Sequence, residues 1–322
     1  MANTKRILSL THEQDVDGLF SSAILKNAFP DTLVFLTNYG HKNVERAAAA
    51  IKFNVARSRK NGIIVISDLG ADDVQDIEPI EDAANNARNY GWDFVWLDHH
   101  VWSEKIKRRV NSFASLILPN DKVKCTAELV YEKFANNRRT CEKIAKFAHI
   151  VDFRLQEVHK LPPLPELITY YRSMPNPYPK LQSIVNKASK GIFWDDDLQE
   201  DFDQYLPLRE SALFAAMKSL TIYNICNYKV AITESPRIIS KSILSEKIFV
   251  EKPEVNLVIL FAPDGKVSIR RRPGSDIKCD VIGQKLNGGG HNHAAAGLIK
   301  NSSESLQIGQ VAQELEIILR NL

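Results

Sequence analysis

LTHEQDVDGLF, residues 10–20, places one histidine and two aspartates directly after an apolar run and directly before Gly-Leu-Phe. The apolar run, RILSLT at 6–11, is typical of a strand that is buried on both faces of a parallel sheet. Asp-x-Asp-Gly alone can be turn chemistry, because Asp and Gly both favour turns. His12, Asp15 and Asp17 are also side chains that bind metal ions, so further ligands are sought along the chain.

The first 120 residues alternate between two patterns. Three more short apolar runs follow the first, at 32–37, 62–67 and 93–97. Amphipathic stretches with helical periodicity separate them, near 18–28, 42–60 and 73–90. This alternation predicts the α/β fold class, with a parallel doubly wound sheet. Two further helices are expected over 126–152.

The second half of the chain has a different character. A Pro-rich stretch at 160–179 cannot form one long helix and indicates a domain edge. Beyond residue 228, three strand-like runs precede a glycine-rich turn and a final helix, which predicts a second, smaller α+β domain. We expect a catalytic cleft between the two domains. The expected organisation is a catalytic domain, a helical linker and a substrate-binding domain, at 1–190, 191–225 and 226–322.

Composition limits the class of protein. A net charge of +3 over 322 residues is too small for a general nucleic-acid coat, so any such site must be local. The four cysteines lie 16, 85 and 53 residues apart, which matches neither a zinc site nor a disulfide framework. The N-terminus lacks the apolar stretch of a signal peptide, and no run approaches the ~20 apolar residues of a membrane span. We therefore expect a cytoplasmic protein without a membrane partner.

Further candidate ligands stand where the other strands end. The third strand runs into Asp68, the fourth runs into Asp98, His99 and His100, and Asp152 ends a predicted helix. A single such Asp is usually a helix cap or a turn former. The carboxyl ends of parallel strands face one crevice, however, so their recurrence favours a joint site. Carboxylate and imidazole ligands suit Mn²⁺ or Mg²⁺, and this number of ligands suits two ions.

Four short motifs carry a family resemblance. THEQDVDG, ISDLG, LDHH and VDF, in that order, resemble the motifs of the DHH phosphoesterase superfamily. VSIRRR followed by LNGGGHNHAAAG is similar to the DHH-associated C-terminal domain, which excludes the family II pyrophosphatases. The resemblance spans almost the whole chain. It points to NrnA-type oligoribonucleases, RecJ-type exonucleases, cyclic-dinucleotide phosphodiesterases and archaeal-type members.

The resemblance implies a role for each motif residue. One metal ion would be held by His12, Asp15 and Asp68. The other would be held by Asp17, Asp68, His99 and Asp152, with Asp68 bridging. Asp98 and His100 would be the catalytic pair, with Asp98 orienting its neighbouring histidine. The expected cofactor is Mn²⁺, two per site, with Mg²⁺ or Co²⁺ as alternatives. His12 precedes the first Asp by three positions, whereas several family members have a spacing of four.

Substrate-binding residues are expected in the second domain. The glycines of the turn, Gly288, Gly289 and Gly290, can adopt positive φ and let backbone amides approach an anion. His291 follows them directly. Strand alternation places Arg270 and Arg272 on one face and Arg271 on the other. We expect these glycines, His291, Arg270 and Arg272 to bind a phosphate or base of a nucleotide.

The predicted reaction is two-metal hydrolysis of a phosphodiester that releases nucleoside 5′-monophosphates. The chain stops after the second domain and shows no extended basic groove, which favours short single-stranded RNA or DNA, linear or cyclic dinucleotides, or 3′-phosphoadenosine 5′-phosphate. The alternative is a RecJ-like single-strand-specific 5′→3′ exonuclease, for which the basic stretches at 57–60 and 105–110 would guide the strand. A catalytically silent replication scaffold is a third option, and a homodimer is left open.

Overall fold

The computed structural model describes residues 6–58, 61–71, 73–120, 123–299 and 306–320. The chain divides into two compact units, Met1–Gln199 and Glu200–Leu322. The division falls within the long helix α9 (Asp196–Ser219). The helical linker predicted over 191–225 is therefore shorter in the structure, because Thr221–Ile225 form strand β6 of the second sheet.

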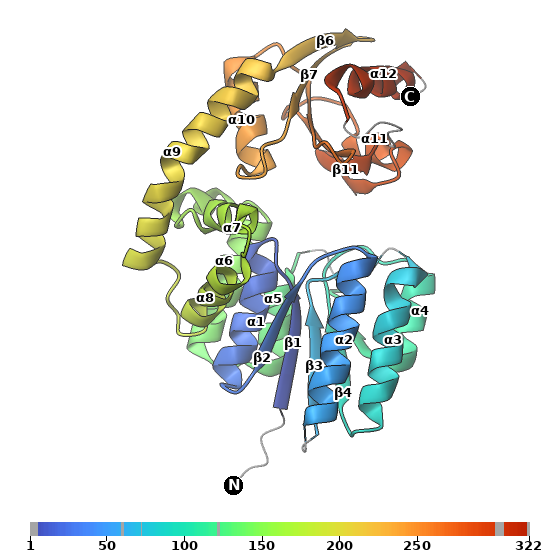
Figure 1. Ribbon diagram of the computed structural model, residues 1–322, viewed down its shortest axis with the longest axis vertical. Coiled ribbons are helices and arrows are strands. Elements are labelled where there is room, and N and C mark those ends of the chain that lie inside the picture. Colours follow the sequence, from blue (N-terminus) through green and yellow to red (C-terminus); the bar gives the residue numbers. More distant parts are fainter. Residues whose placement is uncertain (1–5, 59–60, 72, 121–122, 300–305, 321–322) are drawn as a thin grey trace. The chain divides into compact units, whose positions relative to one another are not determined.

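The first unit is built on a five-stranded sheet (Figure 1). Its strands are β1 (Arg6–His12), β2 (Leu33–Thr37), β3 (Gly62–Ser67), β4 (Asp93–Leu97) and β5 (Ser115–Ile117). All neighbours are parallel, in the order β2-β1-β3-β4-β5. After β1 the chain forms β2 at one edge of the sheet. It then crosses to the other side of β1, where β3, β4 and β5 follow in order toward the opposite edge. Ligands bind at such a switch point, beyond the carboxyl ends of the strands.

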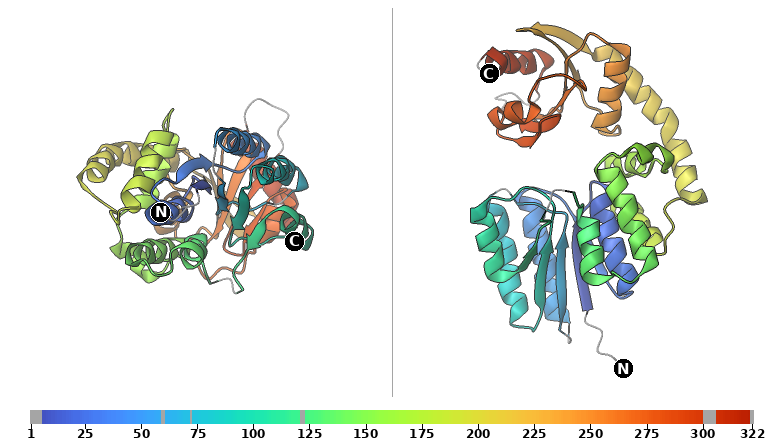
Figure 2. Two further views of the ribbon diagram at one scale, coloured as in Figure 1. Left: turned by 90° about the horizontal axis from the view of Figure 1, so that it is seen from below. Right: turned by 180° about the vertical axis from the view of Figure 1, so that it is seen from behind.

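Helices cover both faces of this sheet (Figures 1 and 2). One face packs against α2 (His41–Arg57), α3 (Val74–Arg88) and α4 (Glu104–Phe113). The opposite face packs against α1 (Val16–Ala28) and α5 (Thr126–Phe134), with α6 (Arg139–Asp152) against α1. Alternate residues of a strand face opposite sides of the sheet. In β1, Leu8 lies in the hydrophobic core that includes α2, α3 and α4, whereas Ser9 contacts Ser22 of α1 on the other face. The predicted doubly wound α/β fold is confirmed.

The Pro-rich stretch forms helices of the first unit. After a short 3₁₀ helix, η1 (Gln156–Lys160), come α7 (Leu164–Ser173) and α8 (Tyr178–Ala188). Each helix carries a proline in its first turn, where the missing N–H costs no helical hydrogen bond. Both helices pack on α1.

The second unit is a smaller α+β domain, as predicted. Its sheet order is β10-β11-β9-β8-β7-β6, and only β7 and β8 run parallel. Besides β6, its strands are β7 (Tyr228–Glu234), β8 (Leu257–Phe261), β9 (Lys266–Arg271), β10 (Gly289–His291) and β11 (Ala294–Leu298). Helices α11 (Cys279–Lys285) and α12 (Ile308–Arg320) cover one face. Helix α10 (Lys241–Glu251) and the end of α9 cover the other.

The structure also bears on the cysteines and on membrane association. All four cysteines are free thiols, three of them buried, as the spacing predicted. Within the described ranges, no helix combines the length and the apolar character needed to cross a bilayer.

Candidate metal centre

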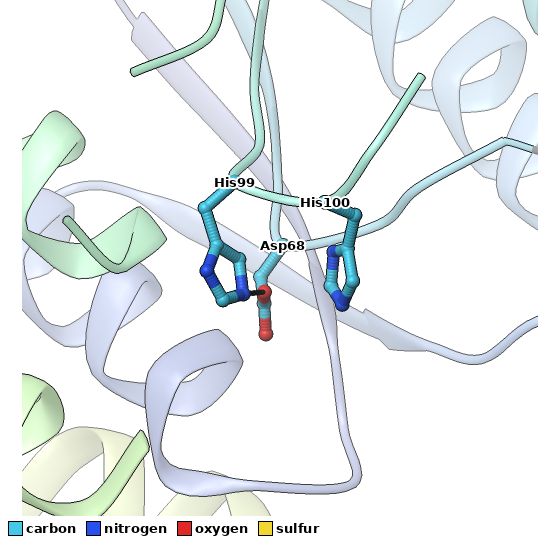
Figure 3. Close-up of side chains that lie close together, drawn as sticks. All are labelled: Asp68, His99 and His100. Carbon is cyan, nitrogen blue, oxygen red and sulfur yellow. Dashed lines mark ion pairs between the residues drawn. The ribbon is translucent and has the colours of Figure 1, made fainter. Parts of the chain in front are cut away.

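The predicted ligands of the first unit converge at the carboxyl ends of β1, β3 and β4. They form three groups, and within each group the ligand atoms lie within 4.8 Å of one another. The groups are His12, Asp15 and Asp68; Asp17, His99 and Asp152; and Asp68, His99 and His100. Asp68 and His99 each belong to two groups, so the ligands form one continuous cluster. Figure 3 shows the two histidines on either side of Asp68.

The distances within the cluster are those of side chains that face one point rather than bond to one another. His12 Nδ1 lies 3.3 Å from Asp15 Oδ2 and 3.7 Å from Asp68 Oδ2. His99 Nε2 lies 3.6 Å from Asp68 Oδ1, and its Nδ1 lies 3.6 Å from Asp152 Oδ2. Separations near 3.6 Å are too long for good hydrogen bonds. They suit ligand atoms that share a cation.

Helix ends fix the two aspartates of the first motif. Asp15 is the N-cap of α1 and accepts a hydrogen bond from the Gly18 amide at 3.1 Å. Asp17 stands in the first turn of α1, and its carboxylate accepts hydrogen bonds from the amides of Thr126 and Ala127 at 2.7 and 2.8 Å. These amides are the free N-terminus of α5, which favours a negative charge. Asp17 therefore has little freedom to turn away from the cluster.

Asp68 occupies an unusual backbone conformation at the centre of the cluster. It follows β3 with a φ of 57°, in the left-handed region that few residues other than glycine adopt. Its amide donates to the Leu97 carbonyl at 3.1 Å, and Thr126 Oγ1 donates to its carboxylate at 3.2 Å. Such backbone strain persists where the surroundings enforce it, and it is concentrated at functional sites.

Asp98 is bound by protein groups instead of facing the cluster. It is fully buried. Its Oδ1 lies 2.9 Å from His100 Nδ1, and its Oδ2 accepts from Trp102 Nε1 at 2.5 Å. Burial alone would raise the pKa of Asp98, but these hydrogen bonds outweigh burial and hold it below its usual value. This geometry supports the orienting role predicted for Asp98, because it fixes the His100 ring through Nδ1 and leaves Nε2 free.

The pKa shifts of the carboxylates and the hydrogen bonding of His12 indicate whether the cluster suits divalent cations. Burial, followed by repulsion from Asp15 and Asp17, raises the pKa of Asp68 well above its ordinary value. Burial and the same two carboxylates raise the pKa of Asp152 to about 8. Both ring nitrogens of His12 are buried and have no hydrogen-bond partner in the described part of the chain. Crowded carboxylates and unpartnered imidazole nitrogens fit divalent cations with oxygen and nitrogen ligands.

Three residues of the site were missed by sequence reasoning. Tyr39 contacts His12 and His100 edge-on, with ring centroids 4.7 and 6.5 Å apart. It follows β2 by two residues, so the same search of strand ends would have found it. Trp102 and Thr126 act through Asp98 and Asp68, from a loop and a helix start that carry no local signal.

Arg272, one of the predicted substrate-binding residues, is engaged by backbone carbonyls of its own unit. Its Nε donates to the Val255 carbonyl at 2.7 Å, and its Nη2 donates to the Phe249 and Lys252 carbonyls, both at 2.9 Å. The guanidinium also lies 4.9 Å from the centre of the Phe249 ring. Arg272 thus satisfies the carbonyls at and beyond the end of α10. These bonds give Arg272 a structural role, and its binding of substrate stays a prediction, as does that of Arg270 on β9.

The glycines of the turn differ in how closely neighbouring atoms pack against them. A Cβ at Gly288 would lie 2.2 Å from the Ala296 carbonyl oxygen, so close packing on β11 requires glycine there. Gly290 adopts a φ of 141°, and a Cβ would lie 2.6 Å from Ala295 Cα. At Gly289 nothing lies within 4 Å of the Cβ position, and His291 is exposed. Packing therefore leaves Gly289 and His291 open, and the ligand contacts of this turn stay a prediction.

Comparison with known proteins assigns the segment that carries this cluster to a family. Residues 6–152 match the model of the DHH family, N-terminal domain. This part of the chain belongs to the DHH family. The DHH match begins with β1 and ends at Asp152, so it contains every predicted metal ligand. Comparison with curated proteins gives no match.

Two solved structures resemble this chain over nearly its full length. An uncharacterized protein from Helicobacter pylori G27 is 21% identical, with 99% of this chain and 100% of that chain covered and a TM-score of 0.47. A pGpG-specific phosphodiesterase, PggH from Vibrio cholerae, is 12% identical, with 98% of each chain covered and a TM-score of 0.55. At this identity the second similarity shows a shared fold.

Proposed function

We propose that this DHH-family chain hydrolyses phosphodiester bonds in short oligonucleotides or dinucleotides and releases nucleoside 5′-monophosphates. The observation that carries the proposal is the cluster of carboxylates and imidazoles around Asp68. When bound there, two Mn²⁺ ions, or Mg²⁺ or Co²⁺ in their place, supply Lewis-acid activation of the phosphoryl group and of water. One ion would be held by His12, Asp15 and Asp68, and the other by Asp17, Asp68, His99 and Asp152.

The protein's own groups orient the reactants. Asp98 binds Nδ1 of His100 at 2.9 Å, which presents Nε2 of a ring that is 45% exposed in its side chain. An imidazole fixed in this way can donate a hydrogen bond to a phosphate oxygen of the substrate. Asp17 and Asp68 are held by the start of α5, so the ligand set is arranged before substrate arrives. Such preorganisation lowers the cost of reaching the transition state.

Charge pairing supports a short substrate over a long strand. On α4, Arg109 pairs with Glu78 and Glu81, and Lys107 pairs with Glu104. Two of the four basic residues at 105–110 are thus paired with carboxylates, which weakens the track that a RecJ-like exonuclease would need. In the stretch at 57–60, Arg59 and Lys60 lie outside the described residues. The Vibrio cholerae protein is named for a linear dinucleotide, and we propose a substrate of the same class here.

A length series tests this function. The purified chain with Mn²⁺ is given end-labelled single-stranded RNA and DNA from two to about 25 nucleotides, beside linear and cyclic dinucleotides. Asp152→Asn removes a predicted ligand, and Asp31→Asn is the matched control on an exposed carboxylate. We expect the rate to be greatest at two to four nucleotides and to be lost in Asp152→Asn alone.

Other outcomes have defined meanings. A rate that holds or rises with length, with a 5′-to-3′ ladder, would replace the proposal by the RecJ-like alternative. Hydrolysis that persists in Asp152→Asn would contradict the assigned site. No hydrolysis of any substrate in the wild-type chain would favour a catalytically silent scaffold.

A further inference from the structure

Arg172 is a charged residue beside the metal centre that has no role in the account so far. It lies in the last turn of α7, directly after the buried Tyr171. Helix α7 packs on α1. Both side views of the ribbon place α7 near the carboxyl ends of the strands, where α1 begins (Figures 1 and 2).

Arg172 is half-buried, and its guanidinium has no partner in the described part of the chain. Among the residues that the structure describes, none forms a hydrogen bond or an ion pair with it. Other arginines of the first unit are engaged: Arg109 pairs with two glutamates, and Arg138 donates to carbonyls at the end of α1. Withdrawing a cation from water without a partner is costly. A fold that retains such a cation has donors available for an anionic ligand.

The charges that act on Arg172 belong to the first motif. They are the carboxylates of Glu13 and Asp15, on the loop that joins β1 to α1 and carries His12. Burial lowers the pKa of Arg172, against the attraction of these two carboxylates. Asp15 itself accepts a hydrogen bond from the Gly18 amide, and its Oδ2 lies 3.3 Å from His12 Nδ1. Arg172 thus lies close to this loop while its donors remain unused.

We propose that Arg172 is a substrate-positioning residue whose guanidinium binds phosphate oxygens of the nucleotide at the metal centre. The inference rests on the proposed function and deepens it. A planar guanidinium matches two phosphate oxygens at once and keeps its charge at any working pH. It adds a fixed positive charge to a site whose own side chains are mainly acidic. The bound group is either the scissile phosphate or a 5′-terminal phosphate of the substrate.

Kinetics on paired substrates test the proposal. Arg172→Ala and Arg172→Lys are compared with Arg139→Ala, which removes an exposed arginine at the start of α6. The substrates are a linear dinucleotide with a 5′-phosphate and the same dinucleotide without it. We expect Arg172→Ala to lower kcat/KM about 10- to 100-fold, since hydrogen bonds to charged groups are worth that much. Arg172→Lys should recover part of the loss, and Arg139→Ala should match the wild type.

The two substrates identify the phosphate. An equal loss on both assigns Arg172 to the scissile phosphate, whereas a loss confined to the 5′-phosphorylated substrate assigns it to the terminal phosphate. Unchanged kinetics in Arg172→Ala on both substrates would overturn the inference.

A binding measurement separates this inference from the proposed function. Calorimetric titration of the Mn²⁺-loaded chain with guanosine 5′-monophosphate reports phosphate binding without turnover. We expect the affinity to fall at least about tenfold in Arg172→Ala and to be unchanged in Arg139→Ala. If the wild type hydrolyses nothing but binds the nucleotide through Arg172, the proposed function fails and the inference stands. Equal affinities in Arg172→Ala and the wild type would contradict the inference, whatever the activity.

Discussion

Gly18, in the first motif, has no room for a side chain. A Cβ there would lie 2.2 Å from the carbonyl oxygen of His12 and 3.0 Å from its Cβ. The close approach exists because α1 begins directly against the end of β1. The glycine of Asp-x-Asp-Gly thus places Asp15 and Asp17 beside His12, which gives the motif a structural reason for that residue.

We predict that Gly18→Ala displaces His12 from the cluster. The free energy of unfolding should fall by about 1–3 kcal/mol, the usual cost of overpacking, and Mn²⁺ affinity should fall with it. Urea denaturation and metal titration measure the two effects. Gly309→Ala on α12 is the control, because nothing lies within 4 Å of its Cβ position. That variant should be unchanged or up to about 1 kcal/mol more stable. Wild-type Mn²⁺ affinity in Gly18→Ala would contradict the prediction.

Trp102 positions His100 through Asp98, so its indole N–H should matter to catalysis. Trp102→Phe removes the hydrogen bond to Asp98 Oδ2. We expect kcat to fall about tenfold or more, the usual effect of losing an orienting hydrogen bond. Trp92→Phe is the matched control, because Trp92 is equally buried and its Nε1 has no partner in the described structure. Both variants should lose similar stability, and an equal loss of kcat in both would refute the role of Trp102.

At the scale of elements, the sequence was most informative where strands end. Apolar runs predicted β1 to β4 closely, and the residues that follow them, among them Asp68 and His99, proved to be neighbours. Helix α9 lies within the predicted helical linker, whose last residues, Thr221–Ile225, form β6 instead. Thr126 was missed because the α5 N-terminus reaches Asp17 and Asp68 through tertiary packing, which no local pattern records.

The end of α10 gives a prediction for the second unit. Arg272 donates three hydrogen bonds to carbonyls at or near that helix end. Arg272→Ala should lower the free energy of unfolding by about 2 kcal/mol, since charged donors are lost from paired carbonyls. Arg237→Ala, on an exposed arginine, should be neutral. Hydrogen exchange of α10 and urea denaturation measure the effect. A loss of substrate affinity in Arg272→Ala without a loss of stability would favour the predicted substrate-binding role over the structural one.

At the scale of the whole molecule, the metal-free centre is a source of instability. The folded chain keeps the proton of Asp152 up to a pKa of about 8, whereas the ordinary pKa of Asp is 3.8. Between these values the folded state binds more protons than the unfolded state. The stability that Asp152 contributes to the metal-free protein is therefore lost as the pH rises through this window. Cations relieve the same repulsion and compete with the protons.

We accordingly predict that metal stabilises the protein more at higher pH. Saturating Mn²⁺ should raise Tm by a larger margin at pH 7.5 than at pH 5.5, as differential scanning calorimetry would show. The Asp152→Asn variant should gain less at both values and show a smaller difference between them. An equal gain in Tm at the two pH values would mean that the cations bind outside this cluster.

The central claim is that the ligands around Asp68 hold two divalent ions, and anomalous diffraction from crystals soaked in Mn²⁺ tests it most directly. The account predicts two peaks at the manganese edge. One peak should contact His12, Asp15 and Asp68, and the other should contact Asp17, His99 and Asp152. Peaks that lie elsewhere, or none at this cluster under saturating Mn²⁺, would contradict the claim.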